Sequence, residues 1–174
     1  MKSSKNIVFL GMMGSGKTSI GSLVSKKLKI SFFDIDQLIE KELNLTVSKI
    51  FEINGEKFFR ELEEKITLKI LRKENIVVSL GGGGFLNKNI RDEILLNHLS
   101  FWLKCKPEVI IKRIKNNPKR PIALNSTKNE LTNLIKRRSK IYSKAMYCIN
   151  CDNLTKNKII GKIVEIYETN KVNN

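Results

Sequence analysis

A glycine-rich segment near the start of the chain could bind phosphate. Residues 11–18 read Gly-Met-Met-Gly-Ser-Gly-Lys-Thr and match the pattern G-x-x-x-x-G-K-[ST] at every fixed position. Glycines let backbone N–H groups converge on phosphate oxygens, the lysine supplies a cation for the β- and γ-phosphates, and the threonine hydroxyl is a hard ligand for Mg²⁺. We therefore predict a nucleoside triphosphate site, with Mg²⁺ on the threonine, formed by Gly14, Ser15, Gly16, Lys17, Thr18 and Ser19.

Two carboxylates follow the next apolar run, in the segment Phe33-Asp34-Ile35-Asp36. In an extended chain, side chains at positions i and i+2 point to the same side. Beside a phosphate site, Asp34 could complete the metal site, while Asp36 could orient a substrate hydroxyl or accept its proton. The structural alternative is that the aspartates cap the helix expected to begin near Gln37, which would explain Asp36 but not both.

An arginine and a run of glycines are candidates for substrate contact. Arg60 lies among the apolar residues of an expected helix, where it could pair with neighbouring glutamates or hold a substrate carboxylate bidentately. The neighbouring glutamates are Glu56, Glu63 and Glu64. Residues 81–84 are all glycine and follow an expected strand, which indicates close approach of the backbone to a ligand or positive φ. A plain flexible loop is the alternative.

Two basic segments lie further along the chain. Residues 112–126 are polar, basic and broken by prolines, so Arg120 could belong to a lid that closes over a transferring phosphate, or it could be a solvated loop residue. The following helical pattern carries Arg137 and Arg138. Adjacent helical residues point about 100° apart, so we expect at most one of these two arginines to face the site.

Apolar runs alternate with helical patterns along the chain, which favours an α/β fold with a parallel sheet covered by helices on both faces. The expected strands are residues 6–10, 31–34, 76–80, 100–104 and 146–150. The expected helices are residues 17–28, 36–43, 46–53, 56–73, 88–97, 107–115, 127–144 and 156–168, followed by a frayed tail from about 169. Ligands of such sheets bind beyond the carboxyl ends of the strands. The length of 174 residues favours a single domain, 1–174.

Composition limits the class of protein. The net charge of +16 is spread along the whole chain, without a run of five like charges or interleaved stacking aromatics, which disfavours a nucleic-acid role. No apolar stretch is long enough to span a membrane, so we expect a cytoplasmic protein. Cys148 and Cys151 form one C-x-x-C, but the chain has a single histidine, so we expect them and Cys105 to be buried free thiols rather than metal or redox sites.

Together these motifs resemble the shikimate kinase family over roughly residues 7–145. The resemblance is carried by the phosphate loop at 11–18, Asp34-Ile35-Asp36, Gly55-Glu56-Lys57-Phe58-Phe59-Arg60, Gly81-Gly82-Gly83, Arg120-Pro121, and Arg138 ahead of Ile141-Tyr142. It implies a three-layer α/β/α fold like that of nucleoside monophosphate kinases, with a five-stranded parallel sheet in the order 2-3-1-4-5. It also implies a monomeric, cytoplasmic, Mg²⁺-dependent enzyme that transfers the ATP γ-phosphoryl group to the 3-hydroxyl of shikimate.

The resemblance further implies residue roles. It implies a substrate-binding region at about 34–62, in which Asp36 holds the ring hydroxyls and Arg60 holds the carboxylate. Outside that region, Arg138 also holds the carboxylate and Gly82 contacts the ring. Around the nucleotide it assigns Lys17 and Arg120 to the moving phosphoryl group, Arg113 to adenine, Thr18 and Asp34 to Mg²⁺, and residues 113–126 to a lid. The chain departs from the family after the fifth strand, where residues 151–157 replace a basic loop that often packs against adenine.

Three other functions remain open at the level of the sequence. A kinase of the same fold could act on gluconate or a nucleoside monophosphate, although a nucleotide acceptor should call for base-reading residues rather than a carboxylate clamp. A regulatory module could bind nucleotide without turnover. A basic nucleic-acid-binding protein is the third alternative.

Overall fold

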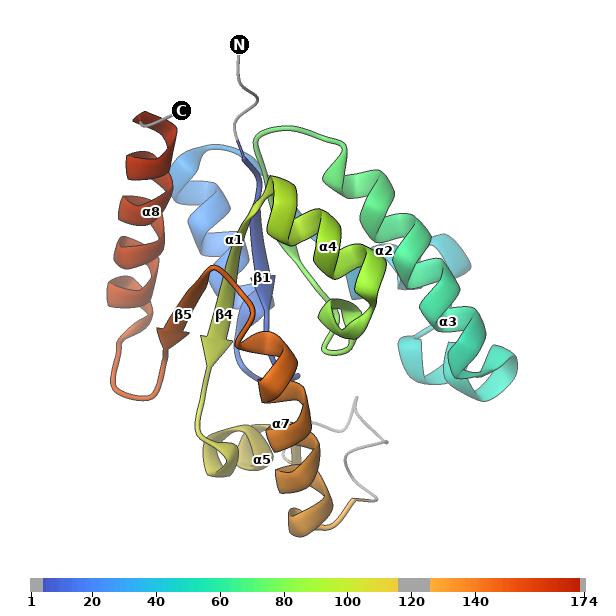
Figure 1. Cartoon of the computed structure of the whole chain (residues 1–174). Helices are drawn as coiled ribbons and strands as arrows, with labels where there is room; N and C mark the ends of the chain where they lie inside the picture. Colours follow the sequence, from blue (N-terminus) through green and yellow to red (C-terminus); the bar gives the residue numbers. More distant parts are fainter. Residues whose placement is uncertain (1–4, 116–125, 173–174) are drawn as a thin grey trace.

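A five-stranded parallel sheet lies between two layers of helices (Figure 1). The computed structural model describes residues 5–115 and 126–172. The strands are β1 (Ile7–Leu10), β2 (Ser31–Asp34), β3 (Ile76–Ser79), β4 (Leu99–Lys104) and β5 (Tyr147–Asn150). They are arranged in the order β2-β3-β1-β4-β5, and every pairing is parallel. The predicted α/β class and strand order are therefore confirmed.

The helices follow the predicted pattern closely. They are α1 (Lys17–Leu28), α2 (Ile35–Leu43), α3 (Val47–Leu71), the short 3₁₀ helix η1 (Gly84–Leu86), α4 (Lys88–Asn97), α5 (Pro107–Lys115), α7 (Lys128–Tyr142) and α8 (Lys156–Val172). The two helices predicted between residues 46 and 73 join into α3 across a break at Gly55, whose backbone is not helical. The predicted fraying from about 169 is wrong, because α8 continues to Val172. Arg120 and most of the predicted lid lie outside the described residues.

Alternate residues of the central strands feed two hydrophobic cores, one on each face of the sheet. Ile7 and Phe9 of β1 pack with α1 and α8, whereas Val8 and Leu10 pack with the helices of the opposite face. Because both faces are covered, β1 and β3 are buried along their whole length. This explains why these strands appear in the sequence as continuous apolar runs. Within the described residues, no helix has the length and apolar character needed to cross a membrane.

The three cysteines differ in their surroundings. Cys105, just after β4, is buried, but Cys148 in β5 is exposed and Cys151 is half-buried. The expectation of three buried thiols is therefore wrong for Cys148. The reason is that β5 is an edge strand, so one of its faces is less completely covered than those of the central strands.

The single histidine gives a testable dependence of stability on pH. His98 is 7% exposed, and burial lowers its pKa from 6.5, although Glu93 lies 3.5 Å from its Nε2 and opposes the shift. The folded state therefore favours the neutral ring. As the pH falls below 6.5, the unfolded chain binds the proton more readily, and the free energy of unfolding should decrease.

Urea unfolding between about pH 7.5 and 5.5 measures this effect. A His98→Asn variant should show a weaker pH dependence over the same window, because it has no imidazole left to titrate. Equal slopes for the two proteins would show that His98 does not couple protonation to folding.

Candidate active site

The loop between β1 and α1 has the geometry of a phosphate cradle. Gly14 and Gly16 adopt φ angles of 79° and 96°, which other residues adopt only with strain. Gly16 is the N-cap of α1 and provides no capping side chain, so the first-turn N–H groups of α1 can bind an anion. Lys17 is buried, and its Nζ donates hydrogen bonds of 2.9 Å to the carbonyl oxygens of Gly11 and Met12. The predicted lysine therefore lies against the loop itself.

Thr18 and Asp34 bring two hard oxygen ligands together beside this loop. The Thr18 hydroxyl donates a 2.6 Å hydrogen bond to Asp34 Oδ2. The other carboxylate oxygen of Asp34 accepts a 3.2 Å hydrogen bond from the backbone N–H of Gln37. A hydroxyl and a carboxylate are a donor set that Mg²⁺ accepts, so the residues present fit the metal.

The prediction that Asp34 and Asp36 share one side of an extended chain is wrong. The chain turns into α2 at Ile35, so Asp34 is the N-cap of the helix and Asp36 lies in its first turn. The structural alternative, in which Asp36 caps the helix, is therefore also wrong, because Asp34 is the cap. As a result, Asp34 contacts Thr18 while the side chain of Asp36 lies against the glycine run.

The glycine run is the place where the candidate side chains converge. A Cβ added to Gly81 would lie 2.5 Å from Asp36 Oδ1 and 2.6 Å from Glu63 Oε1. A Cβ added to Gly83 would lie 2.5 Å from Arg60 Nη1. Only glycine lets the carboxylates and the guanidinium approach the backbone this closely. The run therefore accommodates protein side chains, whereas its predicted contact with a ligand stays a prediction.

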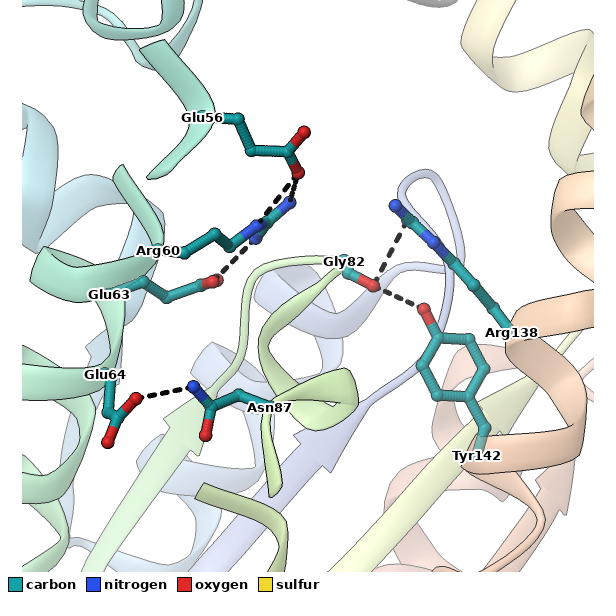
Figure 2. Close-up of polar contacts among 8 residues, drawn as sticks. All are labelled: Glu56, Arg60, Glu63, Glu64, Gly82, Asn87, Arg138 and Tyr142. Carbon is teal, nitrogen blue, oxygen red and sulfur yellow. Dashed lines mark hydrogen bonds and ion pairs between the residues drawn. The ribbon is translucent and has the colours of Figure 1, made fainter. Parts of the chain in front are cut away.

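Arg60 is held by two carboxylates from its own helix (Figure 2). Its Nη1 lies 2.6 Å from Glu63 Oε2, and its Nε and Nη2 each lie 3.3 Å from Glu56 Oε1. The guanidinium carbon also lies 5.2 Å from the centroid of the Phe59 ring. Burial alone would lower the pKa of Arg60, but the two glutamates outweigh it and raise the pKa. Arg60 is thus a permanent, oriented cation.

The two glutamates that hold Arg60 differ in burial. Glu63 is 1% exposed, and this burial raises its pKa even though the charges of Arg60 and Arg138 act in the opposite direction. The Glu56 side chain is 67% exposed, so its ion pair is weak and easily exchanged. The third predicted partner, Glu64, points elsewhere and accepts a 2.6 Å hydrogen bond from Asn87.

Arg138 reaches the opposite side of the glycine run from α7. Figure 2 shows Gly82 between Arg60 and Arg138. Arg138 Nη1 donates a 3.3 Å hydrogen bond to the carbonyl oxygen of Gly82, and the Tyr142 hydroxyl donates to the same oxygen. Burial raises the pKa of Tyr142 to about 12, which keeps it a hydrogen-bond donor. Arg137 is exposed, so the prediction that at most one of the paired arginines faces the site is confirmed.

The remaining nucleotide candidates lie around the phosphate loop. Arg113, in the last turn of α5, donates a 3.0 Å hydrogen bond from Nη1 to the carbonyl oxygen of Gly14. The Ser19 hydroxyl is exposed and accepts a 3.3 Å hydrogen bond from Lys156 Nζ, which brings α8 to the start of α1. Ser15, within the phosphate loop, is buried. These contacts place Arg113 and Ser19 beside the phosphate loop, of which Ser15 is a part.

Sequence reasoning did not identify two residues that shape this site, Glu63 and Tyr142. Glu63 appeared only as one of several partners for Arg60, yet it is the buried one. A signal was present, because Glu63 lies four residues after Phe59 and three before Ile66, within the buried stripe of α3. A charged residue in such a stripe indicates a buried partner. Tyr142 belongs to the motif that carries the family resemblance, but no role was predicted for it.

Comparison with known proteins agrees with this geometry. The family model described as "Shikimate kinase" matches residues 13–168. The shikimate kinase of Caldicellulosiruptor bescii is 40% identical over 164 residues, covering 94% of this chain and 95% of its own. The solved structure of the Acinetobacter baumannii shikimate kinase in complex with shikimate has a TM-score of 0.89 at 27% identity, covering 98% of this chain and 96% of its own. That of the Aquifex aeolicus shikimate kinase has a TM-score of 0.85 at 32% identity, with 97% and 99% covered. The chain belongs to the shikimate kinase family.

Proposed function

We propose that this chain transfers the γ-phosphoryl group of ATP to the 3-hydroxyl of shikimate, and that Asp36, Arg60, Gly82 and Arg138 hold the acceptor. The observation that carries this assignment of roles is the convergence of two arginines and an aspartate on one glycine run. Shikimate is a small polyol with one carboxylate, so it needs cations at one end and hydrogen-bond acceptors at the other. The site presents both beside a phosphate loop.

On the acceptor side, the ion pair between Arg60 and the exposed Glu56 is weak, so a substrate carboxylate can replace Glu56 at low free-energy cost. One oxygen of Glu56 accepts hydrogen bonds from two nitrogens of the Arg60 guanidinium, Nε and Nη2. The buried Glu63 accepts a hydrogen bond from the third nitrogen, Nη1. In our proposal the shikimate carboxylate takes over the face that Glu56 covers, while Glu63 keeps Arg60 in place. Asp36 accepts a hydrogen bond from the reacting hydroxyl, and it either orients that hydroxyl or takes its proton.

On the nucleotide side, Thr18 and Asp34 would hold Mg²⁺, which neutralises phosphate charge when it is bound. Lys17 and Arg120 stabilise the charge on the moving phosphoryl group, and Arg113 contributes beside Gly14. Phosphoryl transfer needs mainly positioning and charge stabilisation, so these roles account for most of the chemistry that the protein must supply.

An ADP-release assay with a panel of acceptors tests the proposed function. We expect shikimate with ATP and Mg²⁺ to stimulate ADP release, and gluconate and nucleoside monophosphates to have no such effect. Chelation of Mg²⁺ should abolish the signal. Failure of shikimate to stimulate ADP release would overturn the proposal, and stimulation by gluconate alone would favour the alternative kinase.

The proposal also includes the oligomeric state and the cellular location of the protein. We expect a single-domain monomer that acts in the cytoplasm, which rests on the family resemblance. Light scattering coupled to size-exclusion chromatography measures the mass in solution, and a mass of two or more chains would contradict the monomer.

A Gly83→Ala variant tests the proposed carboxylate clamp. The added methyl group would lie within 2.5–2.7 Å of three guanidinium atoms of Arg60, so Arg60 must move. We expect the KM for shikimate to rise by about 10- to 100-fold, because misplaced contact groups lose transition-state binding. Steady-state kinetics with shikimate as the varied substrate measures this change.

Gly161→Ala is the matched control. An added Cβ at Gly161 in α8 meets nothing within 4 Å, so this variant should keep the wild-type KM. The KM for ATP should change little in either variant. A normal KM for shikimate in Gly83→Ala would mean that Arg60 does not hold the carboxylate.

A further inference from the structure

Cys105 and Cys151 lie next to each other at the carboxyl ends of neighbouring strands. Lys104 of β4 pairs with Asn150 of β5, and the N–H of Cys151 donates a 2.9 Å hydrogen bond to the carbonyl oxygen of Lys104. The two cysteines therefore occupy the next position along each strand. Cα atoms paired across neighbouring strands are about 5 Å apart, which is within the range that a disulfide spans.

This pair is different from the C-x-x-C of the sequence. Cys148 lies three residues before Cys151, so in an extended strand its side chain points to the opposite face. Cys148 is exposed, whereas Cys105 is buried in the core on one face of the sheet and Cys151 packs against the same core. Within the described part of the chain, no three acidic, cysteine or histidine side chains are grouped to hold a metal ion. We therefore consider the two cysteines as a pair of thiols rather than as metal ligands.

The pair lies directly against the phosphate loop. Cys105 Sγ donates a 3.8 Å hydrogen bond to the carbonyl oxygen of Ser15. Arg113, which is bonded to the carbonyl of Gly14, lies close enough to act on Cys105 by its charge. The Cys151 thiol is the main cause that lowers the pKa of Cys105, with Arg113 in support and burial in opposition. A lowered pKa favours the thiolate, which is the reactive form of cysteine.

We propose that Cys105 and Cys151 are a redox-active pair, oxidised by hydrogen peroxide to a disulfide that weakens ATP binding to the adjacent phosphate loop. This inference rests on the proposed use of that loop for ATP. Cys105 is 7% exposed, so a small oxidant is required, and Cys151 is the more accessible partner.

The reaction balances in two steps. The Cys105 thiolate attacks one oxygen of the peroxide, the O–O bond breaks, and hydroxide leaves as water after taking up a proton, which gives a sulfenic acid on Cys105. The Cys151 thiol then attacks that sulfur, loses its proton, and displaces a second water as the S–S bond forms. One peroxide is reduced, two thiols are oxidised, and two waters are released.

Oxidation would alter the phosphate loop in two ways. A disulfide sulfur carries no hydrogen, so the hydrogen bond from Cys105 to the Ser15 carbonyl is lost. The bond also joins the end of β4 to the segment after β5, where Asp152 already accepts a 2.8 Å hydrogen bond from the N–H of Lys106. The disulfide would therefore change the position of the backbone at Cys105, which contacts Ser15.

The test combines peptide mapping with direct measurement of ATP binding in the intact protein. After treatment with hydrogen peroxide, we expect a Cys105–Cys151 disulfide in the wild type and in the matched control Cys148→Ser, detected by mass spectrometry. The Kd for ATP, measured by calorimetry, should rise about fivefold or more and return to its starting value after thiol reduction. In Cys151→Ser, oxidation should stop at a sulfenic acid on Cys105, which dimedone traps when the oxidised protein is unfolded in its presence.

Three results would overturn the proposal: no disulfide, a disulfide that contains Cys148, or a Cys105–Cys151 disulfide without a change in the Kd for ATP. ATP binding is measured without an acceptor. A failure of shikimate to act as substrate would therefore leave this test intact, and the two proposals can fail independently.

Discussion

Replacement of Asp36 by asparagine is expected to lower kcat for shikimate phosphorylation by about 10²- to 10⁴-fold, while the Kd for ATP changes little. Asparagine keeps the shape of the side chain but removes its charge and its capacity to accept a proton. Because Asp36 lies against Gly81, whereas the Thr18 hydroxyl donates to Asp34, the loss should fall on the acceptor. The metal site should be left intact.

The position of Asp36 at the start of α2 strengthens this expectation. It lies in the first turn of the helix, where the positive end of the helix dipole stabilises a carboxylate. Glu63 Oε1 approaches the same point of the backbone, so one carboxylate from α2 and one from α3 meet at Gly81. Glu63 is the carboxylate that holds Arg60. We assign Asp36 to the reacting hydroxyl because of its place beside the glycine run.

Steady-state kinetics and calorimetry with ATP separate the two roles that Asp36 could have. Asp92→Asn is the matched control, because Asp92 is an exposed residue of α4 paired with Lys88, and this variant should behave as the wild type. If Asp36→Asn loses ATP binding as well as turnover, Asp36 serves the metal or the fold.

Most of the fold could be predicted because local and global signals agree. Apolar runs mark strands that are buried on both faces, and the phosphate-loop motif fixes where the first strand ends and the first helix begins. The strand order came from the family resemblance, since alternation of strands and helices alone does not determine it. The positions of Gly81 and Gly83 were predictable for a similar reason, because a run of glycines after a strand has few structural uses.

Features that depend on exact boundaries or on register could not be predicted. Asp34 and Asp36 separate because the helix begins at Ile35, one residue earlier than predicted, and this single residue changes which carboxylate caps the helix. The proximity of Cys105 and Cys151 follows from the register of β4 on β5, which local sequence does not encode. The local C-x-x-C therefore drew attention to the wrong pair.

The second large effect is expected at Arg60, where alanine should lower kcat/KM for shikimate by about 3 kcal/mol of transition-state binding, roughly a factor of 10². The physical reason is the loss of a cation that Glu63 and Glu56 orient on the acceptor side of the glycine run. Arg137→Ala is the matched control, because Arg137 is exposed on α7 and should tolerate the same truncation.

The alanine variant carries a second cost that must be separated from the first. Without Arg60, the buried Glu63 loses its ion-pair partner, which costs about 3–5 kcal/mol of stability in buried pairs and could unfold the protein. Arg60→Ala combined with Glu63→Gln removes both charges, so it should restore much of the stability but not the activity. Thermal unfolding and kinetics on the same samples distinguish the two effects.

Arg60→Lys gives the sharpest test of the clamp. Lysine keeps a positive charge near Glu63, so the fold should be retained, but it cannot form the two parallel hydrogen bonds of a guanidinium to a carboxylate. We expect the KM for shikimate to rise by about tenfold or more, with the KM for ATP unchanged. A lysine variant with the wild-type KM for shikimate would show that charge alone suffices at this position, and an alanine variant with the wild-type kcat/KM would remove Arg60 from the site.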